Sequence, residues 1–218
     1  NKCGSLIKVK NRTITVRGVE ELKLQDYKVI PDRIEAGSYI LATMATKGRL
    51  KLNNFNPKDL ALPLKLYKGM GLKIKKLSNS SYEIYCKKLK SIKKISTKEF
   101  PGYPTDLQAQ LIATQLKSGL KSKVVENIFE NRFIHIPELR RFGANLSIKG
   151  NTVTIDKTSN LLGAEVMATD IRASFSLIIA AMMSKGKTVI NRIYHLDRGY
   201  EDFDLKLKKC GVNISRKK

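Results

Sequence analysis

The sequence contains few of the residues from which metal centres and disulfide frameworks are built. Three cysteines and two histidines occur among its 218 residues, and no two cysteines have the Cys-x-x-Cys spacing. Structural zinc sites take about four ligands, mainly Cys and His, at short spacings. No metal cluster is therefore indicated, and an odd number of distant cysteines predicts reduced thiols. The cysteines are Cys3, Cys86 and Cys210.

Long apolar stretches are also missing from the chain. The longest purely apolar run covers residues 177–183, whereas a membrane-spanning helix needs about 20 such residues. No stretch has the pattern of a secretory signal peptide. The apolar share of 42% is nevertheless sufficient to build a hydrophobic core. We therefore expect a soluble cytosolic protein that has no membrane partner.

Acidic residues are scarce relative to basic ones. The chain has 19 Asp and Glu against 42 Lys and Arg, which gives a net charge of +23. Such a charge attracts polyanions, and nucleic acid is the obvious candidate. The lysines are scattered, however, and the sequence has no dense basic block, no RNP-like aromatic strand and no zinc finger. A nucleic-acid-binding module therefore stays an alternative, and nucleic acid is not the expected partner.

An internal repeat organises the chain. Three segments each contain an aspartate, a long apolar run of helical type, a glycine, a short apolar strand and an aromatic residue. The distance from aspartate to aromatic residue is 23 positions in the first two segments and 24 in the third. This regularity indicates three copies of one structural unit. The segments are residues 31–55, 104–129 and 168–194.

Helix boundaries follow from the residues at the two ends of each apolar run. The aspartates occupy positions typical of helix N-caps, and Thr105 and Thr169 are further capping candidates. The glycines that follow the runs are expected to end the helices in the left-handed conformation. Because the runs are apolar nearly all round, the helices are predicted to lie inside the domain. The aspartates are Asp32, Asp106 and Asp170, and the glycines are Gly48, Gly119 and Gly186.

Each unit is expected to continue with a strand, an outer helix and a hairpin. Pro63 interrupts the first outer helix and weakens that prediction. The predicted strands are residues 49–52, 123–128 and 188–193, and the outer helices are residues 59–68, 137–141 and 201–209. The hairpins are expected to begin at Gly71, Gly143 and Gly211.

The first 30 residues do not belong to these three units. Cys3-Gly4 and the residues after it are similar to Cys210-Gly211 and the residues after it. We therefore expect residues 1–30 to be the end of a preceding domain and residues 31–218 to form a second domain. On this interpretation the chain is a fragment that lacks most of the first domain. The alternative is that residues 1–30 form a hairpin of their own.

Charged residues recur at equivalent places in the units. If the units pack around a pseudo-threefold axis, these residues converge at one end of the domain. Helix N-termini and arginines together favour a phosphate or carboxylate ligand. Aspartates in such a positive field stay ionised and are able to transfer protons. The residues are Asp106, Asp170, Arg132, Arg172 and Arg198.

Each candidate also has a purely structural interpretation. The aspartates are potential caps, and for Asp32 this is the interpretation that we adopt. Arg132 has Glu130 nearby and Arg198 has Asp197 nearby, so both arginines are potential members of surface ion pairs. The histidines, His135 and His195, are expected to have packing or hydrogen-bonding roles.

Several short motifs occur along the chain: PTDLQAQ from Pro104, FENRFIH from Phe129, ATDIRAS from Ala168, HLDRGYE from His195, PDRIEAGSY from Pro31, and LLGAEVMATD ending at Asp170. They resemble motifs of the enolpyruvyl transferases, and within that group those of the UDP-N-acetylglucosamine 1-carboxyvinyltransferases. The resemblance covers essentially the whole chain, and the motifs occur in the correct order.

The resemblance implies an α/β fold and a reaction. Each family domain has three βαβαββ units arranged as an inside-out α/β barrel, with the active site between two such domains. The sugar hydroxyl of UDP-N-acetylglucosamine adds to phosphoenolpyruvate, and phosphate is then eliminated, with no metal and no organic cofactor. Asp106 is implied as the base toward the 3′-hydroxyl, Asp170 as a proton-transfer group, and Ile128 as a neighbour of the nucleotide sugar. Phosphoenolpyruvate would be held by Arg132, Arg172 and Arg198, of which Arg198 is also implied in catalysis.

The chain departs from the family by lacking the first half. In the family that half supplies a Lys-Asn pair, a loop with a reactive cysteine, a basic segment and a strand for the second domain. The cysteines of this chain do not stand at the matching position. We therefore expect the chain to be inactive alone and to need a separate N-terminal half. The alternative is a non-catalytic remnant that keeps the fold.

Overall fold

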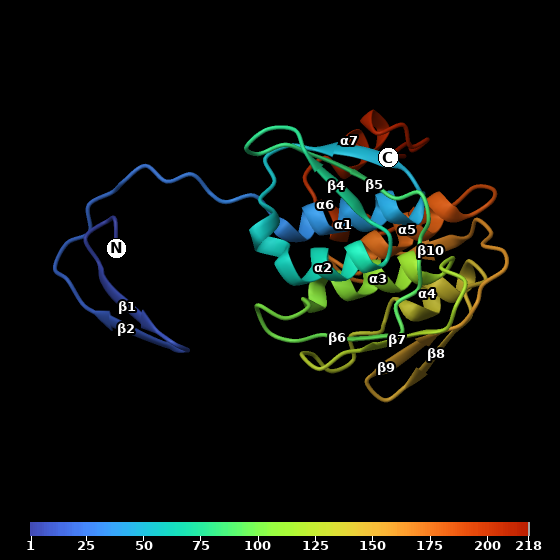
Figure 1. The fold of residues 1–218 in the computed structure, drawn as a ribbon, viewed down its shortest axis with the longest axis horizontal. Coiled ribbons are helices and arrows are strands. Elements are labelled where there is room, and N and C mark those ends of the chain that lie inside the picture. The colour runs from blue at the N-terminus through green and yellow to red at the C-terminus, as the bar shows by residue number, and fades with distance from the viewer. Residues whose placement is uncertain (218) are drawn as a thin grey trace. The chain divides into compact units, whose positions relative to one another are not determined.

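The computed structural model describes residues 1–217. The chain divides into two compact units, Asn1–Pro31 and Asp32–Lys218. The predicted domain boundary was placed after residue 30. The assignment of the first unit to a preceding domain of the family stays a prediction. Figure 1 shows the helices and strands of both units.

The first unit is built around a two-stranded hairpin. Strand β1 (Leu6–Lys10) pairs antiparallel with β2 (Thr13–Arg17), and the strands turn through Asn11, which has a φ of 53°. Asparagine tolerates this left-handed conformation better than most residues. The side chain of Asn1 supports the start of β1 through hydrogen bonds with the backbone N–H and C=O of Ile7.

The second repeat of the larger unit is complete. Its elements follow the order strand, helix, strand, helix, strand, strand, as predicted. Strand β6 pairs parallel with β7, and β7, β9 and β8 continue the sheet antiparallel. The elements are β6 (Lys94–Ser96), the 3₁₀ turn η2 (Thr105–Leu107), α3 (Gln108–Gln115), β7 (Ser122–Val125), α4 (Ile136–Arg141), β8 (Leu146–Lys149) and β9 (Thr152–Ile155).

The first repeat lacks the leading parallel strand within the described residues. Its sheet has the order β3-β5-β4, so β3 lies at an edge where β7 has β6 as a neighbour. Pro63 is the third residue of the outer helix, where no intrahelical N–H bond is lost. The elements are α1 (Arg33–Ala45), β3 (Arg49–Leu52), η1 (Pro57–Leu60), α2 (Ala61–Gly69), β4 (Lys73–Lys76) and β5 (Tyr82–Tyr85).

The third repeat has its first two strands. Residues 211–217 form no strand, so the hairpin predicted to begin at Gly211 is not observed over these residues. The outer helix starts at Phe203 rather than residue 201, since Asp202 has a φ of 46°. The elements are β10 (Glu165–Met167) parallel to β11 (Val189–Asn191), α5 (Ser174–Met183), α6 (Tyr194–Asp197) and α7 (Phe203–Lys209).

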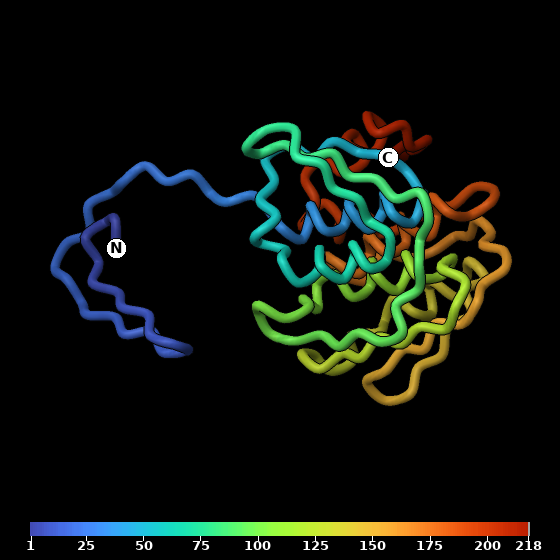
Figure 2. Tube along the Cα trace, in the orientation of Figure 1, coloured from blue at the N-terminus to red at the C-terminus, as the bar shows by residue number. Residues whose placement is uncertain are grey.

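The first helices of the repeats form the centre of the larger unit. Helix α3 packs against both α1 and α5, and the strands lie around these helices (Figures 1 and 2). All eight residues of α3 are buried. This confirms that the apolar runs are interior helices. Of the helices that the structure describes, none combines the length and apolar character that crossing a bilayer requires.

Some predicted helix ends differ from the structure. Asp32 caps α1 by accepting a hydrogen bond from the Ile34 N–H at 2.7 Å. Asp106 lies inside η2, with Pro104 in the N-cap position, so its prediction as a cap is wrong. Asp170 caps the turn before α5 rather than α5 itself, by accepting from the N–H groups of Arg172 and Ala173. Thr105 is not a cap either, because its hydroxyl donates to Glu126 instead.

The prediction that glycines end the central helices in the left-handed conformation is partly wrong. After α1 the left-handed residue is Lys47, with a φ of 54°, and Gly48 begins the connection to β3. Gly119 and Gly186 do have positive φ values of 93° and 88°, but α3 and α5 end earlier, at Gln115 and Met183. The strand at residues 49–52 is confirmed, whereas β7 and β11 are shorter than predicted.

Candidate active site

Asp106 and Arg132 form the first charged pair of the site. Arg132 Nη2 donates to Asp106 Oδ1 at 2.9 Å, and the side chains are 23% and 41% exposed. The guanidinium of Arg132 also lies 5.5 Å from the centre of the Phe129 ring. These partial exposures leave both charges available to a ligand. The alternative pairing of Arg132 with Glu130 is not the one observed.

Arg172 forms the second charged pair, with Asp32. The distance from Arg172 Nη2 to Asp32 Oδ2 is 2.9 Å, and Arg172 Nη1 donates to the Gly199 carbonyl at 2.9 Å. The guanidinium lies 5.3 Å from the centre of the Tyr200 ring. Burial opposes the positive charge of Arg172, but the charges and hydrogen bonds of Asp32 and Tyr200 together outweigh burial and raise the pKa. Asp32 is therefore more than a cap, which corrects its interpretation from the sequence.

Asp170 fixes the backbone that carries Arg172. Its Oδ1 accepts hydrogen bonds from the N–H groups of Arg172 at 2.8 Å and Ala173 at 2.6 Å. Ser174 Oγ accepts from the N–H groups of Thr169 and Asp170, and it donates to the Asp170 carbonyl. Asp170 is therefore held on a rigid turn beside Arg172, close to the second charged pair.

Arg198 is exposed at the end of α6. It lines a surface hollow together with Asp32 and Tyr200, the same two residues that contact Arg172. The neighbouring Asp197 pairs with Arg216 at 2.7 Å, so the alternative pairing of Arg198 with Asp197 is not observed. Arg198 and the Asp32–Arg172 pair therefore lie at the same part of the surface.

A buried hydrogen-bond network joins the two charged pairs. Gln110 Nε2 donates to the Asp106 carbonyl at 2.9 Å, to Ser38 Oγ at 3.1 Å and to the Tyr200 hydroxyl at 3.1 Å. The hydroxyls of Ser38 and Tyr200 are 2.8 Å apart. Ser38, Gln110 and Tyr200 come from the first, second and third repeats, so the network fixes the three repeats relative to one another below the charged surface.

The sequence interpretation did not identify this network. Its only sequence signal was the presence of Ser38 and Gln110 inside helices that are otherwise apolar. Buried polar side chains in such helices need partners, because an unpaired buried polar group is costly. Which partners they have depends on the packing of the three helices, and Tyr200 comes from a distant segment.

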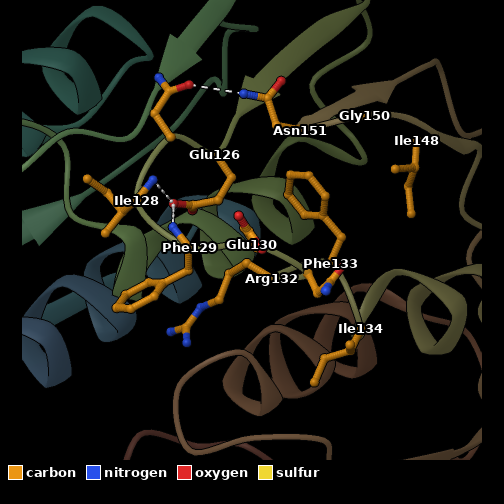
Figure 3. Close-up of a pocket in the computed structure, with 12 residues that line it drawn as sticks. Glu126, Ile128, Phe129, Glu130, Arg132, Phe133, Ile134, Ile148, Gly150 and Asn151 are labelled. Carbon is orange, nitrogen blue, oxygen red and sulfur yellow. Dashed lines mark hydrogen bonds between the residues drawn. The ribbon is translucent and has the colours of Figure 1, made fainter.

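Ile128 lies on the loop that follows β7. The loop residues from Glu126 to Ile134, with Ile148, Gly150 and Asn151, line a hollow of about 820 Å³ (Figure 3). Ile128 is half-buried there, four residues before Arg132. Its contact with a nucleotide sugar stays a prediction. Among residues 1–217, no group of three or more His, Cys, Asp or Glu side chains is placed to hold a metal ion.

His135 is fully buried close behind the site. The pKa of His135 is lowered from 6.5 to about 4, mainly by burial; the charge of Asp170 opposes this shift and the charge of Arg132 adds to it. The neutral ring is thus the native form at neutral pH. This agrees with the expected packing role, and the Phe133 ring lies 6.5 Å away.

This burial predicts a pH dependence of stability. Below the unfolded pKa of 6.5 the unfolded chain binds a proton at His135, whereas the native state binds it only near pH 4. Stability contributed by the neutral ring is therefore lost as the pH falls through this window. Between about pH 7.5 and about pH 5, the loss is about 2 kcal/mol. Urea unfolding at the two pH values measures it.

The matched variants are His135→Gln and His195→Gln. The first variant removes the buried titrating group. Its loss of unfolding free energy between about pH 7.5 and about pH 5 is therefore expected to be smaller by about 2 kcal/mol. The second changes the other histidine and should leave the pH-dependent loss intact. An undiminished loss in the His135 variant would show that other groups cause the pH dependence.

Comparison with known proteins relates this site to a family. The sequence-family model of EPSP synthase (3-phosphoshikimate 1-carboxyvinyltransferase) matches residues 1–207 of this chain. The UDP-N-acetylglucosamine 1-carboxyvinyltransferase of Pelagibacter ubique is 50% identical over 94% of this chain and 49% of its own length. That of Rickettsia prowazekii is 44% identical over 97% of this chain and 50% of its own length.

Solved structures show the same fold. The enolpyruvyl transferase NikO from Streptomyces tendae superposes with a TM-score of 0.85 at 25% identity, over 98% of this chain and 51% of its own. EPSP synthase from Acinetobacter baumannii superposes with a TM-score of 0.70 at 15% identity, over 95% of this chain and 52% of its own. The predicted enolpyruvyl-transferase fold is therefore confirmed.

The chain spans about half the length of the curated relatives that it matches. This agrees with the expectation of a C-terminal half, and the resemblance drawn from the motifs is confirmed. Since the family model covers nearly the whole chain, the chain belongs to the EPSP synthase (3-phosphoshikimate 1-carboxyvinyltransferase) family of enolpyruvyl transferases.

Proposed function

We propose that this chain forms one wall of the active site of a UDP-N-acetylglucosamine 1-carboxyvinyltransferase. The enzyme would transfer the enolpyruvyl group of phosphoenolpyruvate to the 3′-hydroxyl of UDP-N-acetylglucosamine and release phosphate. This is the first committed step of peptidoglycan synthesis, and we expect it in the cytoplasm. The observation that carries the proposal is the convergence of the Asp106–Arg132 and Asp32–Arg172 pairs on one buried network.

The charged pairs suit an anionic substrate. Phosphoenolpyruvate carries a phosphate and a carboxylate, both of which guanidinium groups bind through paired hydrogen bonds. Arg132 and Arg172 are held by carboxylates and aromatic rings, and the exposed Arg198 lines the same hollow as Asp32 and Tyr200, which contact Arg172. Preorganised cations of this kind stabilise negative charge that develops during the reaction. We assign all three arginines to phosphoenolpyruvate.

The reaction has two steps, and each needs a proton transfer. In the addition, the 3′-oxygen bonds to C2 of phosphoenolpyruvate, the hydroxyl proton leaves, and C3 gains a proton. In the elimination, C3 loses a proton and the C2–O bond to phosphate breaks. We assign Asp106 to the hydroxyl proton, because its carboxylate is partly exposed and pairs with Arg132. We assign Asp170 to proton transfer at C3, and Ile128 to contact with the nucleotide sugar.

Phosphate release tests the proposal. We expect no turnover when the purified chain is mixed with both substrates, because one wall of the site is insufficient. Addition of the N-terminal half of a UDP-N-acetylglucosamine 1-carboxyvinyltransferase is expected to restore phosphate release that depends on both substrates. Association of the halves is checked by size-exclusion chromatography.

The outcomes separate the alternatives. Turnover by the chain alone at rates usual for enzymes, about 1–10³ s⁻¹, would overturn the need for a second half. If the two halves are folded and associated but release no phosphate, the chain is instead a non-catalytic remnant. As a control, the N-terminal half alone must release no phosphate.

A further inference from the structure

Glu126 is a buried carboxylate in the loop behind the candidate active site. Its exposed fraction is 3%. Its Oε1 accepts hydrogen bonds from the Ile128 N–H at 2.8 Å, the Phe129 N–H at 3.2 Å and the Thr97 hydroxyl at 2.8 Å. Its Oε2 accepts from the Thr105 hydroxyl at 2.8 Å. Figure 3 shows the two backbone contacts within the loop.

These four bonds join three separate segments. Thr105 directly precedes Asp106, and Phe129 lies three residues before Arg132. Thr97 follows β6, and its hydroxyl also accepts the Asn127 N–H at 2.8 Å. Glu126 therefore connects the segment that carries Asp106 with the loop that carries Ile128 and Arg132.

A carboxylate in this position needs an explanation. Removing an ionised group from water is costly unless hydrogen bonds compensate for it. Bonds from donors to a charged acceptor are among the strongest in proteins, and the four at Glu126 provide this compensation. Two of the donors are amides of the loop that lines the hollow, and a third is the hydroxyl of Thr105, which directly precedes Asp106. The arrangement therefore fixes the geometry of these segments.

We propose that Glu126 is a positioning residue, which holds the Asp106 segment and the Ile128–Arg132 loop in the geometry required for turnover. This inference rests on the proposed function. Glu126 acts through its neighbours and touches no reacting atom. Its loss lets the loop and Asp106 move relative to each other, and displacements of about 1 Å at reacting groups cost on the order of 10²-fold in rate.

Three variants test the role of Glu126. In Glu126→Ala all four hydrogen bonds are lost, and we expect kcat in the two-half assay to fall by about 10²-fold. In Glu126→Gln the amide oxygen still accepts the three bonds now made to Oε1. Its NH₂ group can donate to the Thr105 hydroxyl, which is able to accept. We therefore expect this variant to keep turnover within about fivefold of the unchanged protein.

Thr105→Val removes one of the four bonds and preserves the shape of the side chain. We expect an intermediate fall in kcat and a small fall in the thermal unfolding temperature, because Glu126 Oε2 loses its partner. Glu83→Ala is the matched control, since Glu83 lies on β5 in another sheet and pairs with Arg49. Its kcat should equal that of the unchanged protein. If Glu126→Ala does not fold, Thr105→Val and Glu126→Gln decide the question.

A second readout does not depend on catalysis. Hydrogen exchange of the Ile128 and Phe129 amides in the folded chain is expected to accelerate in Glu126→Ala and to stay slow in Glu126→Gln. If the unchanged halves show no turnover, the proposed function fails, but the exchange rates still report whether Glu126 holds the loop. Equal exchange in all variants, or full kcat in Glu126→Ala, would overturn the inference.

Discussion

Replacing Asp106 by asparagine is expected to lower kcat by about 10²–10⁴-fold in the assay with both halves. Asparagine is unable to accept the hydroxyl proton, yet its amide oxygen can still accept the 2.9 Å hydrogen bond from Arg132. The geometry of the site is therefore preserved while the base is removed. Substrate binding is expected to change less than kcat. Phosphate release at saturating concentrations of both substrates measures the effect.

The matched control for this variant is Asp156→Asn. Asp156 also forms a salt bridge, with Lys121 at 3.2 Å, but it follows β9 and none of the site contacts involves it. Its variant is expected to keep full turnover. A kcat for the Asp106 variant within threefold of the unchanged protein would exclude Asp106 as the base. A rise in KM alone would reduce its role to binding the sugar.

Replacing Phe175 by alanine is expected to lower the free energy of unfolding by about 3–5 kcal/mol. Phe175 is fully buried in α5, with its ring centre 5.5 Å from that of Tyr39 and 4.6 Å from that of Tyr200. The deletion removes buried apolar area and leaves a cavity between side chains of the first and third repeats. Urea denaturation, followed by circular dichroism, measures the loss.

Two further variants make this prediction specific. Phe175→Leu keeps most of the volume and should cost less than about 1.5 kcal/mol. Phe129→Ala removes a ring that is 55% exposed, and the expected cost is below about 1 kcal/mol. Equal losses for the buried and the exposed phenylalanine would contradict the assignment of α5 to the core.

The periodic features of the chain were predictable from the sequence. The interior helices, the strand at residues 49–52 and the outer helix at residues 137–141 were found because apolar runs and turn residues act locally. Errors occurred where local alternatives are close in energy. Lys47 rather than Gly48 takes the left-handed conformation, and Asp106 lies within a 3₁₀ turn instead of capping a helix.

The candidate site was only partly predictable. The charged residues were identified from their repetition and from their motifs, and the structure brings Asp106 to Arg132 and places Arg198 in the hollow that Asp32 lines. Their partners were not foreseen. Asp32 and Arg172 are 140 positions apart, and no periodicity in a sequence specifies a contact over such a distance.

The sequence by itself determined the repeated unit, the apolar character of the central helices and the set of charged residues, because each follows from local chemistry. Only the tertiary structure decided which charges pair. It also decided how Ser38, Gln110 and Tyr200 satisfy one another, and that Glu126 is buried between two site segments. The contacts of Ser38, Gln110 and Tyr200 arise only when the three central helices pack together, and those of Glu126 arise only when distant segments of the second repeat meet.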